Sequence, residues 1–307
     1  MIASTVLAAA RRMAACSGTP DRMVDMLACC LAPLEGSCWP EVAWRFSRLT
    51  SDGFPVEFGF SGEEDGFRVV CEVAGPECAH SARLDAGLAL IRSLGLTPPD
   101  PALVRALRAA QADGPLQWGC WLGLRCKNGD VRAKLYIETP PGSIPLPPVL
   151  AGSRPHMMGC EPSRGLLERY AVIPDASEAR LRHVLRSLPT LSQDILLDAV
   201  ERLIGLPRRS PLRWPSVGAS IAEQPGSSPS VALFLRAEAL RDGGRALLPI
   251  FARRAAYRSL LDSQPHALSG HGVLTLIPHD DRVEFRTNFS ARLAVQSEVL
   301  AGRRFGT

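Results

Sequence analysis

The stretch Leu116–Glu138, LQWGCWLGLRCKNGDVRAKLYIE, decides the fold that we expect for this chain. Two runs rich in apolar residues, Leu116–Cys126 and Val131–Glu138, are joined by the turn sequence Lys-Asn-Gly-Asp. An Asn-Gly pair between two such runs is a strong signal for a β-hairpin. Apolar and polar residues alternate in the second run, so this strand has one apolar and one polar face. The polar face consists of Arg132, Lys134, Tyr136 and Glu138.

Four further pairs of runs, on both sides of this hairpin, have the same character. They are Val56–Phe60 with Phe67–Val73, His156–Glu161 with Leu166–Ile173, Ser216–Ala222 with Val231–Ala237, and Gly272–Ile277 with Val283–Phe289. Segments with apolar residues three and four apart separate the pairs and predict helices. These segments are Met1–Ala15, Asp21–Leu34, Ser81–Leu94, Pro101–Ala112, Ser177–Leu188, Ser192–Ile204 and Arg245–Leu261. The pattern indicates an internal repeat with a period of about 60 residues.

Ten antiparallel strands can close into a barrel, which removes the exposed edges of an open sheet. Helices need an apolar face to pack on, so the charged faces of the strands must point away from them. In a closed barrel these faces point into the lumen, whereas in a sheet covered on one side they point into solvent. We expect a single α/β domain over residues 1–307: a ten-stranded antiparallel barrel of five αββ-type repeats with helices outside. An open sheet whose charged face is an interaction surface is the alternative.

Composition and motifs exclude several classes of protein. The net charge is only +4 and no dense basic stripe occurs, so we do not expect nucleic-acid binding. No long apolar run occurs either, so we do not expect a membrane span. Nine cysteines without a paired CxxC predict reduced thiols in a cytoplasmic protein. No phosphate-binding glycine loop follows a strand. His266, His271 and His279 do not have the spacing of a helix-borne zinc pair, and Arg208, Arg209 and Arg213 predict a solvated loop.

Basic residues on the charged faces would meet in the lumen as an anion receptor. They are Arg68, Arg132, Lys134, Arg236 and Arg286. Arginine binds phosphate oxygens with two parallel donors and lysine acts as a point charge, so this cluster can neutralise a diphosphate without a metal. We therefore expect no required cofactor. Magnesium is possible, but no DDxxD motif supports it, and Asp280-Asp281 is explained by a hairpin turn.

One carboxylate and two tyrosines also lie on the inward-facing sides of the predicted strands. Glu57 can be the ion-pair partner of a basic side chain, or it can accept an N–H or O–H proton from an aromatic nucleophile. Tyr136 and Tyr170 can present π faces that stabilise a carbocation and keep water away from it.

The stretch Ser47–Phe58, SRLTSDGFPVEF, followed by Phe67-Arg68-Val69, resembles the first repeat of the dimethylallyl tryptophan synthases, aromatic prenyltransferases of the α-β-β-α barrel kind. In that family a Glu after a G-x-P turn holds the indole N–H, and an Arg on the next strand binds diphosphate. The resemblance assigns these roles to Glu57 and Arg68. The second repeat resembles the family's K-x-Y strand, which implies that Lys134 binds diphosphate and Tyr136 belongs to a tyrosine shield.

The resemblance implies transfer of a dimethylallyl or longer prenyl group from its diphosphate to an indole or other electron-rich aromatic acceptor, in secondary metabolism. The acceptor would be a small molecule or an aromatic side chain of a peptide. The allyl cation would be covered by Tyr136, Tyr170, Trp121 and Phe234.

Three later repeats depart from the family pattern. They carry Glu168-x-Tyr170, Phe234-x-Arg236 and Glu284-x-Arg286, and the whole chain has three tyrosines. The alternative is therefore a catalytically degenerate barrel that binds an anionic or aromatic ligand, or an interaction module.

Overall fold

The computed structural model of the chain describes residues 2–127, 129–206, 217–236, 239–241, 247–263 and 271–292. Several residues named in the sequence predictions lie outside this part of the chain. They are the helix starts Met1 and Arg245, the turn residue Asn128, the loop arginines Arg208, Arg209 and Arg213, the strand ends Ser216 and Ala237, and His266.

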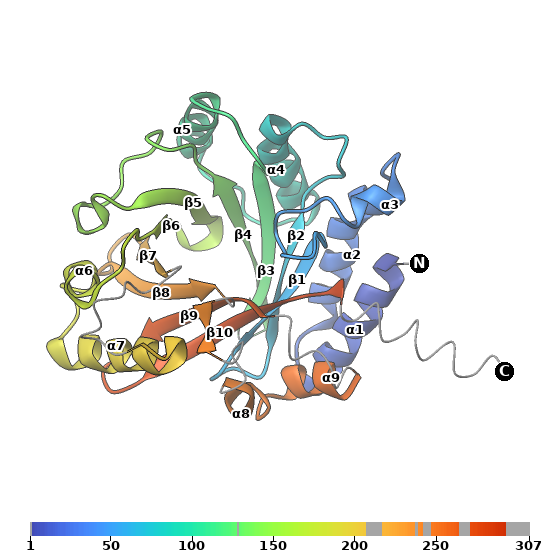
Figure 1. Cartoon of the computed structure of the whole chain (residues 1–307). Helices are drawn as coiled ribbons and strands as arrows, with labels where there is room; N and C mark the ends of the chain where they lie inside the picture. The colour runs from blue at the N-terminus through green and yellow to red at the C-terminus, as the bar shows by residue number, and fades with distance from the viewer. Residues whose placement is uncertain are drawn as a thin grey trace.

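Ten strands form a closed antiparallel barrel in which each strand pairs with its neighbours in sequence and the last pairs with the first (Figure 1). They are β1 (Val56–Ser61), β2 (Phe67–Glu72), β3 (Cys120–Lys127), β4 (Asp130–Glu138), β5 (Arg154–Glu161), β6 (Leu166–Val172), β7 (Val217–Glu223), β8 (Ser230–Arg236), β9 (His271–Pro278) and β10 (Val283–Ser290). Pairing of β1 with β10 leaves neither strand with a free edge. The five predicted hairpins and the predicted fold class are confirmed.

Helices lie on the outside of the barrel (Figure 1). They are α1 (Ile2–Ser17), α2 (Asp21–Glu35), α3 (Pro40–Ala43), α4 (Arg83–Ser93), α5 (Pro101–Ala112), α6 (Glu178–Val184), α7 (Thr190–Ile204), α8 (Leu248–Phe251) and α9 (Ala255–Ser263), with short 3₁₀ segments η1 (His80–Ala82), η2 (Pro148–Leu150) and η3 (Pro162–Arg164). Of the helices described, none combines the length and the apolar character needed to cross a bilayer.

The prediction of one continuous helix over Arg245–Leu261 is wrong. The structure divides its described part into α8 and α9, with Arg254 in the break between them. Arg254 donates a hydrogen bond from Nε to the Gly62 carbonyl at 2.6 Å, in the turn between β1 and β2. This tertiary contact turns the chain at a point where the apolar spacing alone predicts one continuous helix.

A hydrophobic core fills the space between the outer face of the barrel and the helices. Phe58 and Phe60 of β1 are buried there, and the Phe60 ring lies 5.3 Å from the ring of Tyr257 on α9. Because side chains alternate along a strand, Glu57 and Gly59 on either side of Phe58 face the lumen. The polar faces of the strands therefore lie inside the barrel, which is the closed-barrel expectation and not the open-sheet alternative.

Candidate active site

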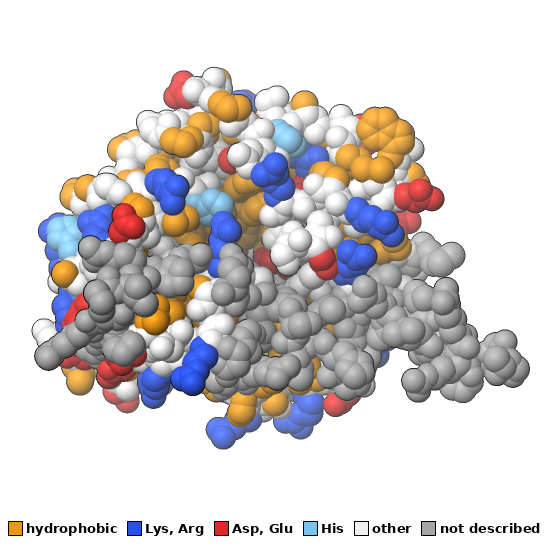
Figure 2. Space-filling view, in the orientation of Figure 1, with side chains coloured by type: hydrophobic (Ala, Val, Ile, Leu, Met, Phe, Trp, Pro, Cys, Tyr) orange, Lys and Arg blue, Asp and Glu red, His pale blue; other side chains and the backbone are white. Residues whose placement is uncertain are grey.

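The inward faces of the strands enclose a cavity of about 330 Å³. Its lining includes the predicted residues Arg68, Lys134, Tyr136, Tyr170 and Arg286. The predicted residues outside this lining are Glu57, Trp121, Arg132, Phe234 and Arg236. The space-filling view shows this face of the molecule hollowed near its centre, with hydrophobic side chains inside the hollow and basic and histidine side chains beside it (Figure 2).

Lys134 of β4 is held by two residues of β6. Its Nζ bonds to the Glu168 carboxylate and lies 2.9 Å from the Tyr170 hydroxyl, which itself donates to Glu168 Oε2 at 2.7 Å. Burial alone would raise the pKa of the Glu168 carboxyl, but the Lys134 ammonium lowers it to about 2. Burial would likewise lower the pKa of Lys134, yet Glu168 raises it well above its usual range. Lys134 and Glu168 are thus a fully charged pair.

Three of the four aromatic side chains predicted to shield a cation, Tyr136, Tyr170 and Phe234, lie close to one another beside this pair. The Lys134 Nζ lies 5.1 Å from the centre of the Tyr136 ring and 5.3 Å from that of Tyr170. The Tyr170 ring is 6.3 Å from Tyr136 and 6.2 Å from Phe234. Gly218 is opposite Phe234 on the neighbouring strand and has no side chain where the Phe234 ring lies. The site thus already holds a cation against the faces of two tyrosines.

Glu57 and Arg68 meet through an asparagine that the sequence analysis did not single out. Asn288 of β10 donates from Nδ2 to Glu57 Oε1 at 2.8 Å and accepts from Arg68 Nη2 at Oδ1, also at 2.8 Å. Glu57 is buried, with 8% of its surface exposed. Burial raises its pKa to about 8, although Arg68 and the Asn288 hydrogen bond act in the opposite direction. The Glu57 carboxyl is therefore largely protonated at neutral pH.

Trp121 belongs to an aromatic group on the same inward face. Its ring stacks on Trp118 at 3.8 Å, and its Nε1 donates to Glu72 Oε1 at 3.0 Å. Glu72 also bonds to the buried Arg83 at 2.5 Å. Trp118 and Trp121 cluster with Val70, apart from the main core, and Tyr136 packs against this cluster. Tyr136 therefore connects the tryptophan group with the Lys134 cation.

The other predicted cations are paired with carboxylates or exposed. Arg286 bonds to both oxygens of Glu284, at 2.6 and 3.1 Å. Arg132 bonds to Asp130 at 2.8 Å, and Arg236 is exposed. The sequence predicts these side chains as a basic cluster that lines the lumen. That expectation omitted their carboxylate partners, which bring the net charge of the lumen down.

Arg125 and Glu161 are lumen residues that the sequence analysis missed. They form an ion pair, both line the cavity, and Glu161 is 1% exposed. The signal was present in the strand pattern: Arg125 alternates with Trp121 and Gly123, so it shares their inward face.

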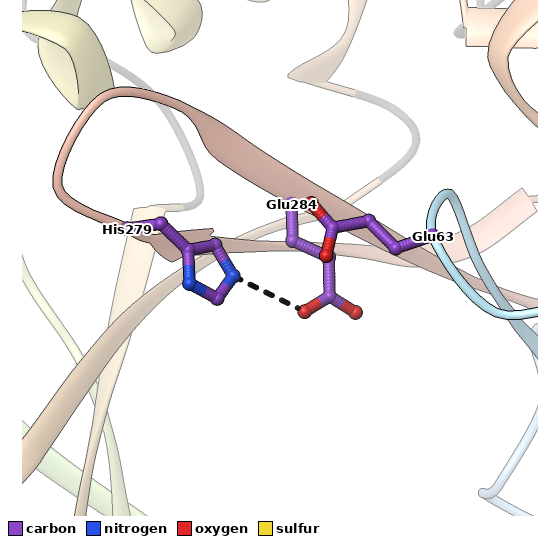
Figure 3. A group of neighbouring side chains, drawn as sticks. All are labelled: Glu63, His279 and Glu284. Atoms are coloured by element: carbon purple, nitrogen blue, oxygen red, sulfur yellow. Dashed lines mark ion pairs between the residues drawn. The ribbon is translucent and has the colours of Figure 1, made fainter.

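Glu63, His279 and Glu284 come together where the β1–β2 and β9–β10 turns meet, with ligand atoms within 4.8 Å of one another (Figure 3). Such residues are common metal ligands. However, Glu63 accepts from Arg282 at 2.8 Å and Glu284 from Arg286 at 2.6 Å. A metal ion would have to lie beside two guanidinium groups, so an ion-pair network explains this group better.

The closed ten-stranded antiparallel barrel with helices outside is the α-β-β-α barrel fold, which is the fold of the aromatic prenyltransferases that the chain resembles. The 6-dimethylallyltryptophan synthase of Micromonospora olivasterospora, in complex with DMASPP and Trp, is 16% identical over 95% of this chain and 98% of its own, with a TM-score of 0.69. The 5-dimethylallyltryptophan synthase of Streptomyces coelicolor is 15% identical over 96% and 98%, with a TM-score of 0.69.

A third similar structure is the prenyltransferase PriB in a ternary complex with L-tryptophan and dimethylallyl thiolodiphosphate. It is 14% identical over 96% of this chain and 97% of its own, with a TM-score of 0.71. The chain matches no protein-family model and no curated protein. The family resemblance predicted from Ser47–Phe58 and the K-x-Y strand is thus confirmed at the level of the fold.

Proposed function

We propose that this protein is a cytoplasmic aromatic prenyltransferase, a single barrel domain over residues 1–307 that transfers a prenyl group from its diphosphate to an electron-rich aromatic acceptor. The observation that carries the proposal is the Lys134 ammonium lying against Tyr136 and Tyr170 in a cavity that Arg68 and Arg286 also line. Cation-binding π faces and anion-binding guanidiniums are the two features that separation of an allyl cation from diphosphate requires.

In the proposed reaction the carbon–oxygen bond of the prenyl diphosphate breaks and the diphosphate leaves with the electron pair. Arg68, Lys134 and Arg286 neutralise its charge, with Arg132 and Arg236 nearer the outside. Tyr136, Tyr170, Phe234 and Trp121 shield the allyl cation from water. These cations can act without a metal, so we expect turnover without added magnesium.

Glu57 would orient the acceptor. In its ionised form the buried Glu57 carboxylate accepts a hydrogen bond from an indole N–H or phenol O–H, which raises the electron density of the ring. A new bond then forms between the allyl carbon and the ring, and the ring proton passes to an oxygen of the departed diphosphate, which restores the aromaticity of the ring. The related structures hold tryptophan, so we expect an indole, as a small molecule or as a side chain of a peptide.

The test is calorimetric titration with dimethylallyl and geranyl S-thiolodiphosphates, with and without magnesium, followed by a mass-spectrometric screen of indoles and phenols with the reactive diphosphates. Arg68→Ala should weaken analogue binding by about 10- to 100-fold, as expected for a hydrogen-bonded charge. Arg169→Ala is the matched control, because Arg169 pairs with Glu223 on the outer face of β6 and β7. Failure of both analogues to bind, with or without magnesium, would reject the proposal.

A second candidate is a degenerate barrel that binds an aromatic ligand without turnover. The bond between Glu168 and Lys134 favours it, because a carboxylate already occupies a donor that the family resemblance assigns to diphosphate. Tight binding of tryptophan or another indole together with no binding of either thiolodiphosphate would support this second function.

A further inference from the structure

Arg68 and Asn288 lie on strands that are not neighbours. Arg68 is on β2 and Asn288 on β10, with β1 between them. Both are opposite the same β1 residue, Gly59, in the strand register. A Cβ at Gly59 would approach Arg68 Cγ at 2.6 Å and Asn288 Oδ1 at 2.8 Å. The two side chains therefore meet across β1 because the position between them has no side chain.

The hydrogen bonds of Asn288 fix the orientation of its amide. A guanidinium only donates, so Arg68 must face Oδ1, and a carboxyl oxygen of Glu57 accepts from Nδ2. The reversed amide would place two donors against each other at Arg68. Asn288 thus relates the position of the Arg68 guanidinium to that of the Glu57 carboxyl.

The Arg68 guanidinium has further N–H donors that do not bond to the Asn288 amide. A guanidinium has five N–H groups, and Asn288 Oδ1 takes a bond from Nη2. Arg68 lines the cavity, so its remaining donors can face an anion there without breaking the bond to Asn288. On the other side of the bridge, the second oxygen of Glu57 can accept a hydrogen bond from an indole N–H when the carboxyl is ionised.

We propose that Asn288 is a positioning residue that couples anion binding at Arg68 to the binding of an indole N–H donor at Glu57. The proposal rests on the function proposed above and adds a residue to it. The first ligand to bind orders the Arg68–Asn288–Glu57 bridge, so the second ligand binds to a side chain that is already ordered. The coupling is therefore positive and, by linkage, has the same size in either order of binding.

The experiment measures L-tryptophan affinity by calorimetry, alone and with saturating dimethylallyl S-thiolodiphosphate. In the native chain the analogue should tighten tryptophan binding by about fivefold or more, the lower range of measured couplings. Asn288→Leu removes both hydrogen bonds and should bring this ratio close to one. Asn288→Asp keeps the acceptor for Arg68 but loses the donor to Glu57, so it should lower the ratio as well. Ser290→Ala, the next inward position on β10, is the control that retains the coupling.

A second readout separates positioning from a merely structural effect. Arg68 from β2 and Asn288 from β10 both favour the ionised form of Glu57. Removing the Asn288 donor should move the midpoint in the pH dependence of tryptophan affinity to higher pH, and Ser290→Ala should leave this midpoint in place.

The outcomes distinguish this inference from the proposed function. If the native chain binds neither thiolodiphosphate nor tryptophan, the proposed function fails first. If the analogue binds but tryptophan does not, or if Asn288→Leu retains the native coupling ratio and pH midpoint, the diphosphate site stands and the role of Asn288 is rejected.

Discussion

Lys134 on β4 and Arg68 on β2 are two cations of the same lumen that are held in different ways. Lys134 bonds to the ionised carboxylate of Glu168, whereas Arg68 bonds to the neutral amide of Asn288. The carboxylate cancels most of the Lys134 charge, and the amide leaves the Arg68 charge in place. The comparison shows that a basic side chain in the lumen binds an anion well only if no neighbouring carboxylate compensates its charge.

The largest expected difference between the two regions is in stability. Lys134→Ala leaves the Glu168 carboxylate, whose side chain is only 16% exposed, without its partner, so we expect the free energy of unfolding to fall by about 3 kcal/mol. Arg68→Ala leaves only a neutral amide unpaired, and we expect a loss of about 1 kcal/mol. Urea denaturation of the two variants measures this difference. Equal losses would contradict the view that the two cations are held differently.

The two regions should also respond to pH in opposite directions. The folded pKa of Glu168, about 2, is below its ordinary 4.5, so its stabilisation is present above pH 4.5 and is lost as the pH falls toward 2. The folded pKa of Glu57, about 8, is above 4.5, so stability is lost as the pH rises from 4.5 to 8. Each slope is at most about 1.4 kcal/mol per pH unit.

Unfolding measured from pH 2 to 9 tests this expectation. Glu168→Gln should reduce the acid slope, to which Glu284, whose pKa Arg286 lowers despite burial, also contributes. Burial raises the pKa of Glu72 to about 6, so Glu57→Gln should remove mainly the slope between pH 6 and 8. A native slope that persists in Glu57→Gln would mean that another group titrates in that range.

A smaller effect is expected when the compensation of Lys134 is removed. Glu168→Gln keeps a hydrogen-bonding side chain but deletes the negative charge, so the affinity for dimethylallyl S-thiolodiphosphate should rise by about fivefold, which equals about 1 kcal/mol of binding free energy. Glu223→Gln, whose carboxylate pairs with Arg169 on the outer face, is the matched control. Unchanged affinity in Glu168→Gln would show that Lys134 does not contact the anion.

The smallest effect concerns the two tyrosines. Tyr170→Phe deletes a hydroxyl that bonds to both Lys134 and Glu168, and it should lower stability by about 1 kcal/mol. Tyr136→Phe keeps the ring that faces Lys134 and should change prenyl transfer less than twofold, since both rings retain a π face. Thermal unfolding and initial rates measure these effects. A large rate loss in Tyr136→Phe would assign chemistry to the hydroxyl itself.

The local pattern of residues was enough to predict the hairpins and the inward faces of the strands. Alternation within a strand and a turn between two strands are local properties, so the run Val131–Glu138 was enough to place Lys134 and Tyr136 on one side. The same alternation along the strand also predicts that Arg125 faces the lumen. The inward direction of the polar faces required the further step of closure, which follows when helices cover the apolar faces of all the strands.

The bonds between inward side chains, in contrast, depend on how the strands assemble in the folded barrel. Glu57 and Asn288 are 231 residues apart in the chain, and Lys134 and Glu168 are 34 apart. Their pairing depends on the register between strands and on the closure of β10 onto β1, which no local pattern specifies. The strand alternation therefore places cations in the lumen. Which of these cations lie beside a compensating carboxylate, and which can bind an anionic ligand with their full charge, depends on the folded barrel.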